Sequence, residues 1–394
     1  MNPSTRLAIV LSHPTQYYSP WFRWLRANTG LTFKVFYLWE FGVRETRDPR
    51  FAAAFKWDVD LLSGYESEFI LNRSTQPGTE TFRGLDNPSL CARLETWNPG
   101  ALLLFGYNWL SHQRALWWAR WQGIPVLFRG DSHLLGRGSL PFARQLALTL
   151  LFRQFAAVTY VGRANRHYFE TLRVSPERLY FAPHSVDAAR FEAAEPMARI
   201  AAGSLRSALN LVDRCVVLFA GKFHADKQPL ELLRAFAAVA TARDALVFVG
   251  DGPEKASLQD LARAHPHACV RFLPFANQTE MPARYLLADV VALPARGSYE
   301  TWGLAVNEAM HLGVPCLVSD RVGCQADLVE DGETGWVFPS ENSAALAATL
   351  RSALNSTAEE RSRRGRAARA RVAHYTYRQT SAGLLEALAA TPIR

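Results

Sequence analysis

The sequence has few cysteines, and none of them stands in a pattern that builds a fold. Its 394 residues include five cysteines, which are scattered and odd in number. A disulfide framework is therefore excluded as the basis of the fold, and a reducing compartment is favoured. The paired His and Cys spacings that are typical of zinc sites are also missing.

Long apolar runs are missing as well. No segment has 18 uninterrupted apolar residues, so the sequence predicts no membrane span. The apolar run within the first 14 residues is too short for a signal peptide and fits a first β-strand instead. These features favour a cytoplasmic protein. The prediction also allows peripheral contact with the anionic inner face of a membrane.

The composition describes a globular protein of more than one domain. Apolar residues make up 49% of the chain and charged residues 20%, and the length allows two ordinary domains. The formal net charge of +8 indicates anionic partners, such as nucleoside diphosphates, anionic lipid or nucleic acid. No nucleic-acid recognition module is recognisable, so a nucleic-acid partner is not expected.

Apolar strands alternate with helical patterns along most of the chain. The first strand (6–12), a helix (21–28) and a second strand (33–38) form the β-α-β start of a doubly wound sheet. Residues 40–98 are predicted to be long loops. A second α/β series begins near residue 216, after an Ala-rich and charged connection. The predicted domains are 1–190 and 213–373, with a linker at 191–212 and a final helix at 374–394.

The helical pattern at residues 140–155 allows two interpretations. Its apolar residues recur at helical spacing, with arginines between them. This pattern favours a helix of the core. The alternative is a basic amphipathic helix that rests on a membrane surface.

The most informative stretch lies between residues 292 and 338. A buried strand ends at Pro294, and a loop then leads through Glu300 to a helix at 304–312, which Gly313 and Pro315 terminate. A loop and helix start at the carboxyl end of a parallel strand suit a phosphate, because free N–H groups and the helix dipole meet there. Gly303 would let the backbone approach such a ligand. Glu300 and Glu308 could then accept hydrogen bonds from hydroxyl groups on either side of a diphosphate.

This stretch resembles the donor site of the retaining glycosyltransferases of family 4, which have the GT-B fold. Their signature pairs two glutamates across seven residues. The matching residues here are Glu300, Trp302, Gly303, Leu304, Glu308, Ala309, Met310, Gly313 and Pro315. The resemblance implies an α/β protein with two Rossmann-like domains facing a central cleft. It also implies that Glu308 bonds the ribose of a nucleoside-diphosphate sugar and that Glu300 bonds the sugar.

The resemblance extends to other donor-binding loops. Gly221, Lys222 and Lys227 match a phrase whose two cations hold the diphosphate, and the loops at Gly250 and Phe275 flank the nucleotide. Since Lys and N–H groups would already meet the diphosphate charge, no metal or other cofactor is expected.

The acceptor side departs from the family pattern. The first loop carries His13 and Gln16 where many relatives have glycines, and Asp131 stands where they often have histidine. His133 follows two residues later, so either residue is a candidate to act on the acceptor, and a helix N-cap is the alternative role for Asp131.

We therefore predict a metal-independent retaining glycosyltransferase that acts on a glycan, lipid-linked or small-molecule acceptor. The alternatives are a GT-B epimerase or phosphorylase, and a non-catalytic scaffold that binds a nucleotide sugar.

Overall fold

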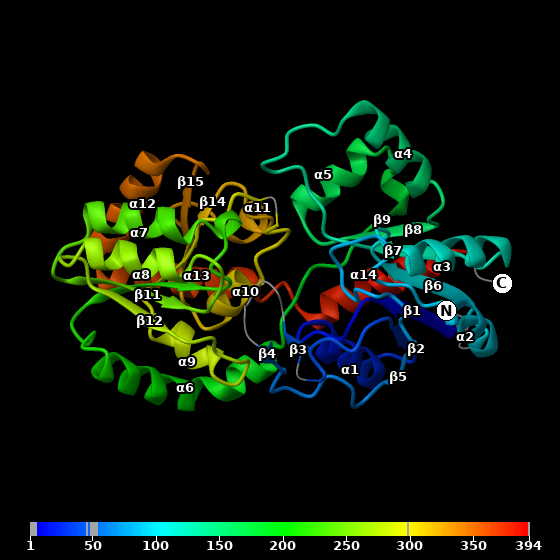
Figure 1. The fold of residues 1–394 in the computed structure, drawn as a ribbon, viewed down its shortest axis with the longest axis horizontal. Coiled ribbons are helices and arrows are strands. Elements are labelled where there is room, and N and C mark those ends of the chain that lie inside the picture. The colour runs from blue at the N-terminus through cyan, green and yellow to red at the C-terminus, as the bar shows by residue number, and fades with distance from the viewer. Residues whose placement is uncertain (1–5, 45, 48–53, 298, 393–394) are drawn as a thin grey trace.

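The computed structural model describes residues 6–44, 46–47, 54–297 and 299–392. The first five residues of the predicted N-terminal domain and the last two of the predicted final helix lie outside the described residues. Two parallel sheets, each covered by helices, form the two halves of the molecule, which lie side by side in Figure 1.

The N-terminal sheet has the strand order β5-β2-β1-β6-β7-β8-β9 within the described residues, and all its pairs are parallel. Its strands are β1 (Arg6–Leu11), β2 (Thr32–Tyr37), β5 (Glu66–Phe69), β6 (Ala101–Phe105), β7 (Val126–Arg129), β8 (Ala157–Tyr160) and β9 (Leu179–Phe181). Five helices follow its strands: α1 (Tyr18–Asn28), α2 (Leu90–Trp97), α3 (Leu110–Trp121), α4 (Phe142–Phe152) and α5 (Arg163–Thr171). Central strands such as β6 are buried along their whole length, as a sheet covered on both faces requires.

The C-terminal sheet has the order β12-β11-β10-β13-β14-β15. Its strands are β10 (Cys215–Ala220), β11 (Asp244–Val249), β12 (Val270–Leu273), β13 (Val290–Leu293), β14 (Cys316–Ser319) and β15 (Gly335–Phe338). One face packs against α7 (Pro229–Val239), α8 (Lys255–Ala264) and α12 (Ser343–Asn355). The other packs against α6 (Ala188–Ala208), α9 (Met281–Leu286), α10 (Leu304–His311) and α13 (Ala358–Val372). The order reverses between β10 and β13, which is where ligands bind in such sheets.

Two helices lie where the chain passes between the halves. The predicted connection is largely the helix α6, which contacts α9 of the C-terminal half. The last helix, α14 (Tyr377–Ala389), contacts α1, β8 and β9 of the N-terminal half (Figure 1). Its Ser381 hydroxyl accepts a hydrogen bond from the Trp21 indole at 2.9 Å. The remaining short elements are α11 (Gln325–Leu328), a turn of 3-10 helix at Pro176–Arg178 and another at Ala225–Lys227.

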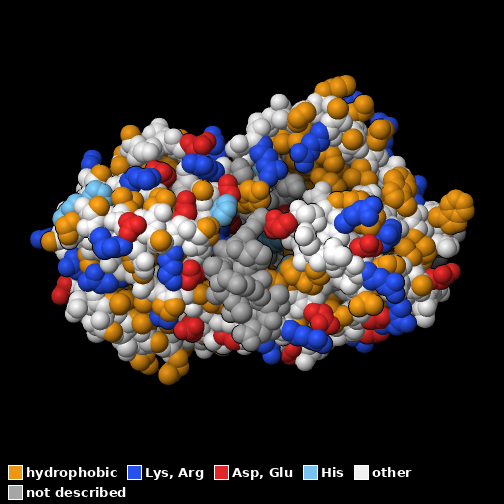
Figure 2. Space-filling model, viewed as in Figure 1, with side chains coloured by type: hydrophobic (Ala, Val, Ile, Leu, Met, Phe, Trp, Pro, Cys, Tyr) orange, Lys and Arg blue, Asp and Glu red, His pale blue; other side chains and the backbone are white. Residues whose placement is uncertain are grey.

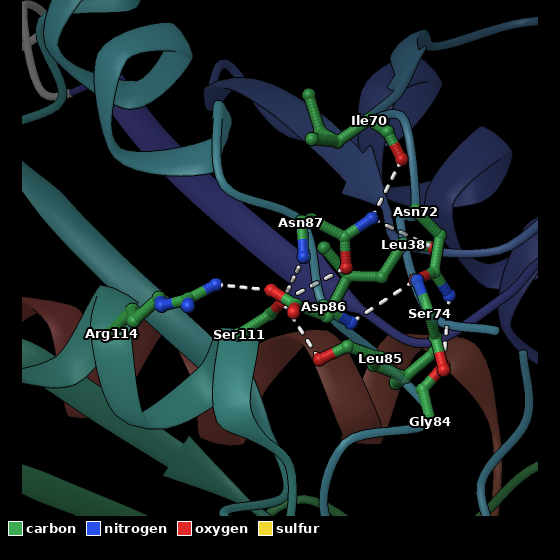
Figure 3. Close-up of polar contacts among 10 residues, drawn as sticks. All are labelled: Leu38, Ile70, Asn72, Ser74, Gly84, Leu85, Asp86, Asn87, Ser111 and Arg114. Atoms are coloured by element: carbon green, nitrogen blue, oxygen red, sulfur yellow. Dashed lines mark hydrogen bonds and ion pairs between the residues drawn. The ribbon is translucent and has the colours of Figure 1, made fainter. Parts of the chain in front are cut away.

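The prediction of long loops at 40–98 is wrong in part. Besides the short pair β3 (Thr46–Arg47) and β4 (Ala54–Phe55), this region supplies the edge strand β5 and the helix α2. Its loops are also ordered by buried polar side chains (Figure 3). The amide of Asn87 donates to the carbonyls of Leu38 and Ile70 at 3.0 and 2.7 Å, and its oxygen accepts from Ser111 at 2.9 Å. These bonds fix the loop before α2 against the sheet.

The favoured interpretation of residues 140–155 as a core helix is also wrong for one face. Among the residues of α4, only Leu148, Thr149 and Phe152 are buried. The helix starts at Phe142, which is 81% exposed. The pattern predicted the helix correctly, but an apolar face of α4 lies on the molecular surface.

Candidate functional site

A cavity of about 440 Å³ lies between the two halves, at the carboxyl ends of β10 and β13. Most of the predicted site residues line it, and they come from both halves of the chain. The predicted residues that line the cavity are Gln16, Asp131, Gly221, Lys222, Lys227, Gly250, Phe275, Glu300, Trp302, Gly303, Leu304 and Glu308. His13 and His133 do not line it.

One end of the cavity holds an ion pair between two predicted residues. The ammonium of Lys227 lies 2.8 Å from Glu300 Oε2, and both side chains are largely shielded from solvent. Lys227 ends the 3-10 turn that follows β10, and Gly221 begins that loop with φ +152°. A Cβ at Gly221 would lie 3.3 Å from the Lys227 ammonium, so the glycine leaves room for this cation and its ligand.

The other end of the cavity is built around a buried carboxylate. Glu308 lies one turn into α10 and is 2% exposed. Its Oε2 accepts a hydrogen bond from the Tyr285 hydroxyl at 2.6 Å, whereas its Oε1 is buried with no hydrogen-bond partner among the described residues. Burial raises the pKa of Glu308 above its ordinary value, although Tyr285 and the charge of Arg190 oppose this rise. A buried acceptor left open in a cavity suits a ligand hydroxyl.

The start of α10 lies between these two acids. Gly303 is the N-cap of the helix, in a left-handed conformation with φ +104°. A Cβ there would come within 2.9 Å of Val322, so a side chain cannot be accommodated. Gly303 and Leu304 both line the cavity, and the first N–H groups of a helix have no partner within it. The site therefore offers N–H groups and the positive end of a helix dipole between two carboxylates.

Trp302, within this loop, anchors it to its surroundings. Its indole donates to the Asn307 side chain at 2.8 Å, and the ring is 2% exposed. It lies between the rings of His184 and Tyr375, at centroid distances of 5.8 and 5.9 Å. The loop is thus anchored to α10 and to the segments that join the two halves.

Asp131 contacts both halves of the protein. Its Oδ2 accepts from the Thr301 hydroxyl at 2.8 Å and lies 3.2 Å from His184 Nε2. Burial alone would raise the pKa of Asp131, but these hydrogen bonds and the His184 charge lower it to about 2. Asp131 is therefore an ionised carboxylate at the cavity wall. It does not cap a helix, as its alternative interpretation proposed, because no helix begins beside it.

His133 holds the donor loop and does not face the cavity. Its Nδ1 accepts from the Leu135 backbone N–H at 3.1 Å, so its Nε2 carries the proton that bonds the Glu300 carbonyl at 3.2 Å. Burial lowers the pKa of His133, which favours this neutral form. His13 lies farther out, 3.0 Å from the Ser12 hydroxyl and edge-on to the ring of Phe41.

Several residues at the site were not predicted from the sequence. Tyr285 and Tyr17 line the cavity beside Glu308, and burial followed by the Glu308 charge raises the pKa of Tyr17 well above its ordinary value. Thr301 and His184 hold Asp131. Only His184 carried a signal. It stands in Pro183-His184-Ser185-Val186-Asp187, which resembles a phrase of the family that has asparagine at the position of His184.

The expectation of metal independence assumed that the chain has no Asp-x-Asp sequence. This assumption is wrong, because Asp58-Val59-Asp60 is such a sequence. Asp58 accepts hydrogen bonds from the backbone N–H groups of Gln278 and Thr279. Asp60 Oδ1 accepts from the N–H groups of Leu62 and Ser63. Both carboxylates thus already stabilise loops, and metal independence stays a prediction.

The fold and site together define a protein of two parallel α/β halves with a cavity between them. Solved structures with the same arrangement are GT-B glycosyltransferases, which confirms the predicted fold class. The Anabaena protein HepE, in complex with UDP and glucose, matches with a TM-score of 0.73 over 98% of this chain and 99% of its own, at 15% identity. Sucrose-phosphate synthase from Thermosynechococcus elongatus matches with a TM-score of 0.72 over 98% of both chains, at 18% identity.

Sequence comparison identifies the family. The model of the family described as "Glycosyl transferases group 1" matches residues 205–371. A D-inositol 3-phosphate glycosyltransferase of Saccharomonospora viridis is 34% identical over 316 residues, which cover 72% of this chain and 69% of that protein. The chain belongs to the group 1 glycosyltransferases, as its motifs indicated.

A second relative matches over a shorter region. This protein, a GDP-mannose-dependent alpha-(1-6)-phosphatidylinositol monomannoside mannosyltransferase of Mycolicibacterium smegmatis, is 33% identical over 52% of this chain and 54% of its own. The chain thus spans about half the length of that relative.

Proposed function

We propose that this chain is a retaining glycosyltransferase that transfers a sugar from a nucleoside-diphosphate sugar to a hydroxyl group, without a metal. The observation that carries the proposal is the order of groups along the cavity-lining loop and helix. Glu300, paired with Lys227, precedes the helix start at Gly303, and the buried Glu308 follows one turn into the helix. This order matches the sugar, diphosphate and ribose of such a donor.

The donor would be held by groups of complementary charge. The open oxygen of Glu308 would accept hydrogen bonds from the ribose, and Phe275 and Gly250, which line the cavity, would border the nucleotide. Lys222, Lys227 and the first N–H groups of α10 would meet the charge that develops on the departing diphosphate.

Asp131 would act on the acceptor side without forming a covalent bond to the sugar. Front-side attack, in which the leaving phosphate helps to take the acceptor proton, is the route that the resemblance implies. A carboxylate with a pKa of about 2 is a weak base, so Asp131 suits holding the acceptor hydroxyl and stabilising positive charge near the reacting carbon. Gln16 borders the same side of the cavity, and His13 lies beyond it.

The acceptor would be a glycan, a lipid-linked sugar or a small molecule with a free hydroxyl group. The relatives support this range, since they are named as transferases that act on a phosphatidylinositol mannoside and on an inositol phosphate. The alternatives of an epimerase, a phosphorylase or a scaffold are not favoured, because these relatives are named as transferases.

A thermal-shift panel tests the donor assignment first. The full chain is heated with UDP, GDP, ADP and their sugars, and the matching nucleotide should raise the Tm by mass action. Turnover is then measured with that sugar nucleotide and a set of acceptors, and NMR of the product reports the anomeric configuration. An inverted product would overturn the retaining mechanism. Tight donor binding with no transfer to any acceptor class would instead favour the scaffold.

A further inference from the structure

An apolar stripe lies on the solvent side of α4. Phe142, Leu146 and Leu150 follow one another at a spacing of four residues and are 81, 50 and 49% exposed. Residues four apart lie on one face of a helix, so the three side chains form a continuous ridge. In Figure 2, hydrophobic side chains and cationic side chains gather at the upper right of the molecule, where Figure 1 places α4.

The chain around this ridge is cationic and carries no acid. Residues 132–169 contain five arginines and no Asp or Glu. Three of them, Arg137, Arg144 and Arg153, lie before, within and directly after α4 and are exposed. Glu170, which ends the acid-free run, pairs with Arg166 at 2.9 Å. An exposed apolar ridge whose flanking charges along the chain are all cationic is complementary to an anionic lipid surface.

A second exposed apolar pair, on α6, does not have the cationic surroundings of the α4 ridge. Met197 and Ile200 on α6 are 70 and 65% exposed. Their helix also carries Glu192 and Glu195, and Glu195 forms ion pairs with arginines. That pair therefore lacks the charge that would attract anionic lipid.

Helix α3 packs in the same helical layer as α4 and carries a further exposed apolar side chain. Its buried residues, Ala115 and Leu116, share a core cluster with Leu148 and Phe152 of α4, so both helices cover the same face of the sheet. Trp121 of α3 is 90% exposed. Tryptophan is the side chain that favours the boundary between water and lipid.

We propose that α4 docks this protein on an anionic lipid bilayer, with Phe142, Leu146 and Leu150 inserted at the headgroup boundary. The flanking arginines would bind lipid phosphates. A second copy of this chain is a poorer occupant, because two such faces would bring their arginines together. No helix within the described ranges is long and apolar enough to cross the bilayer, so the contact would be peripheral.

Vesicle flotation of the full chain tests the proposal. Vesicles of phosphatidylcholine alone are compared with vesicles that contain an equal share of phosphatidylglycerol, at low and high salt. The wild-type protein should bind the anionic vesicles, and high salt should weaken this binding. The triple variant Phe142→Ser, Leu146→Ser, Leu150→Ser should bind the anionic vesicles with an affinity that is lower by about tenfold or more, because it loses the inserted apolar surface.

The matched control is Met197→Ser with Ile200→Ser, which should bind the anionic vesicles as the wild type does. Because all five positions are exposed, each variant should keep the wild-type Tm and its nucleotide-induced thermal shift. Equal binding by the wild type and the triple variant would overturn the proposal, as would wild-type binding to neither vesicle. A wild-type dimer that the triple variant converts to a monomer, without vesicle binding, would assign the face to a second copy instead. None of these readouts depends on sugar transfer.

Discussion

The substitution Glu308→Gln should weaken nucleotide binding while it leaves the protein as stable or more stable. The change keeps the shape of the side chain and an oxygen that can accept the Tyr285 hydroxyl, which now lies at 2.6 Å. It removes the negative charge that would face the ribose in the proposed donor complex. A hydrogen bond to a charged group contributes about 1.5–3 kcal/mol, so the loss should raise the Kd of the nucleoside diphosphate about tenfold to a hundredfold.

The expected effect on stability has the opposite sign. Burial raises the pKa of Glu308 in the folded protein, so the folded state holds a proton more tightly than the unfolded state. The folding free energy therefore becomes less favourable as the pH rises from the unfolded pKa through the folded pKa, and at pH 7 the ionised carboxylate costs stability. Glutamine does not ionise. The nucleotide-free variant should therefore have a higher Tm than the wild type at pH 7, and should lose this gain at acidic pH.

Calorimetry with the nucleoside diphosphate and thermal unfolding at pH 5 and pH 7 measure the two effects. Glu254→Gln is the matched control, because burial also raises the pKa of Glu254 and its Oε2 is buried without a hydrogen-bond partner among the described residues. Glu254 does not line the cavity. The control should therefore leave the Kd unchanged. A Glu308→Gln variant with a lower Tm and an unchanged Kd would show that Glu308 is a structural residue and refute the ribose assignment.

Four other predictions concern the rest of the cavity. Lys222→Ala and Lys227→Ala should each lower turnover about a hundredfold or more without a change in fold, and unchanged turnover in both would refute the diphosphate assignment. Glu300→Ala should lower kcat while calorimetry shows a near-normal Kd for the bare nucleotide; loss of that binding would place Glu300 at the nucleotide end. Asp131→Asn should lower kcat about tenfold or more, and an unchanged rate would remove it from the reaction. Activity should survive excess EDTA; loss that Mg²⁺ or Mn²⁺ restores would contradict metal independence.

The C-terminal half could be predicted closely because its central strands are buried on both faces. Such strands appear as short apolar runs between turn residues, so β13 ends directly before Pro294, as predicted, and β14 occupies the apolar run Cys316–Ser319. The edge strand β5 has no such run. Its sequence is Glu-Ser-Glu-Phe, and the strand pairs with β2 along one side only. The strand forms because β2 provides its hydrogen-bond partners, and no pattern in its own four residues indicates this.

The helices show a different limit. Periodicity predicts that residues 140–155 form a helix, but it cannot tell which apolar residues meet the core. That depends on the neighbouring elements, and these cover only one side of α4. Residues 188–208 were interpreted as a connection because alanines and charges give no strand signal, yet packing against α9 makes them a long helix with Pro196 inside it.

At the cavity, spacing along one loop predicted the Glu300 and Glu308 pair. The partners of Asp131 could not be predicted in this way. Thr301 lies 170 residues away and meets Asp131 only because the two halves face each other. His184 lies 53 residues away and meets Asp131 because both follow strands, β9 and β7, of the N-terminal sheet. A local pattern does not encode that approach.

The two glutamates of the cavity differ in how far the N-terminal half holds them. Glu308 and its hydrogen-bond partner Tyr285 both belong to the C-terminal half, and from the N-terminal half Tyr17 lines the cavity beside them. The loop that carries Glu300 is held from both sides. Lys227 and the Gly323 N–H of the C-terminal half bond its carboxylate and its carbonyl, while His133 bonds the same carbonyl and Asp131 bonds the next side chain. We therefore expect the sugar side of the donor site to depend more on the contact between the halves than the binding of the bare nucleotide does.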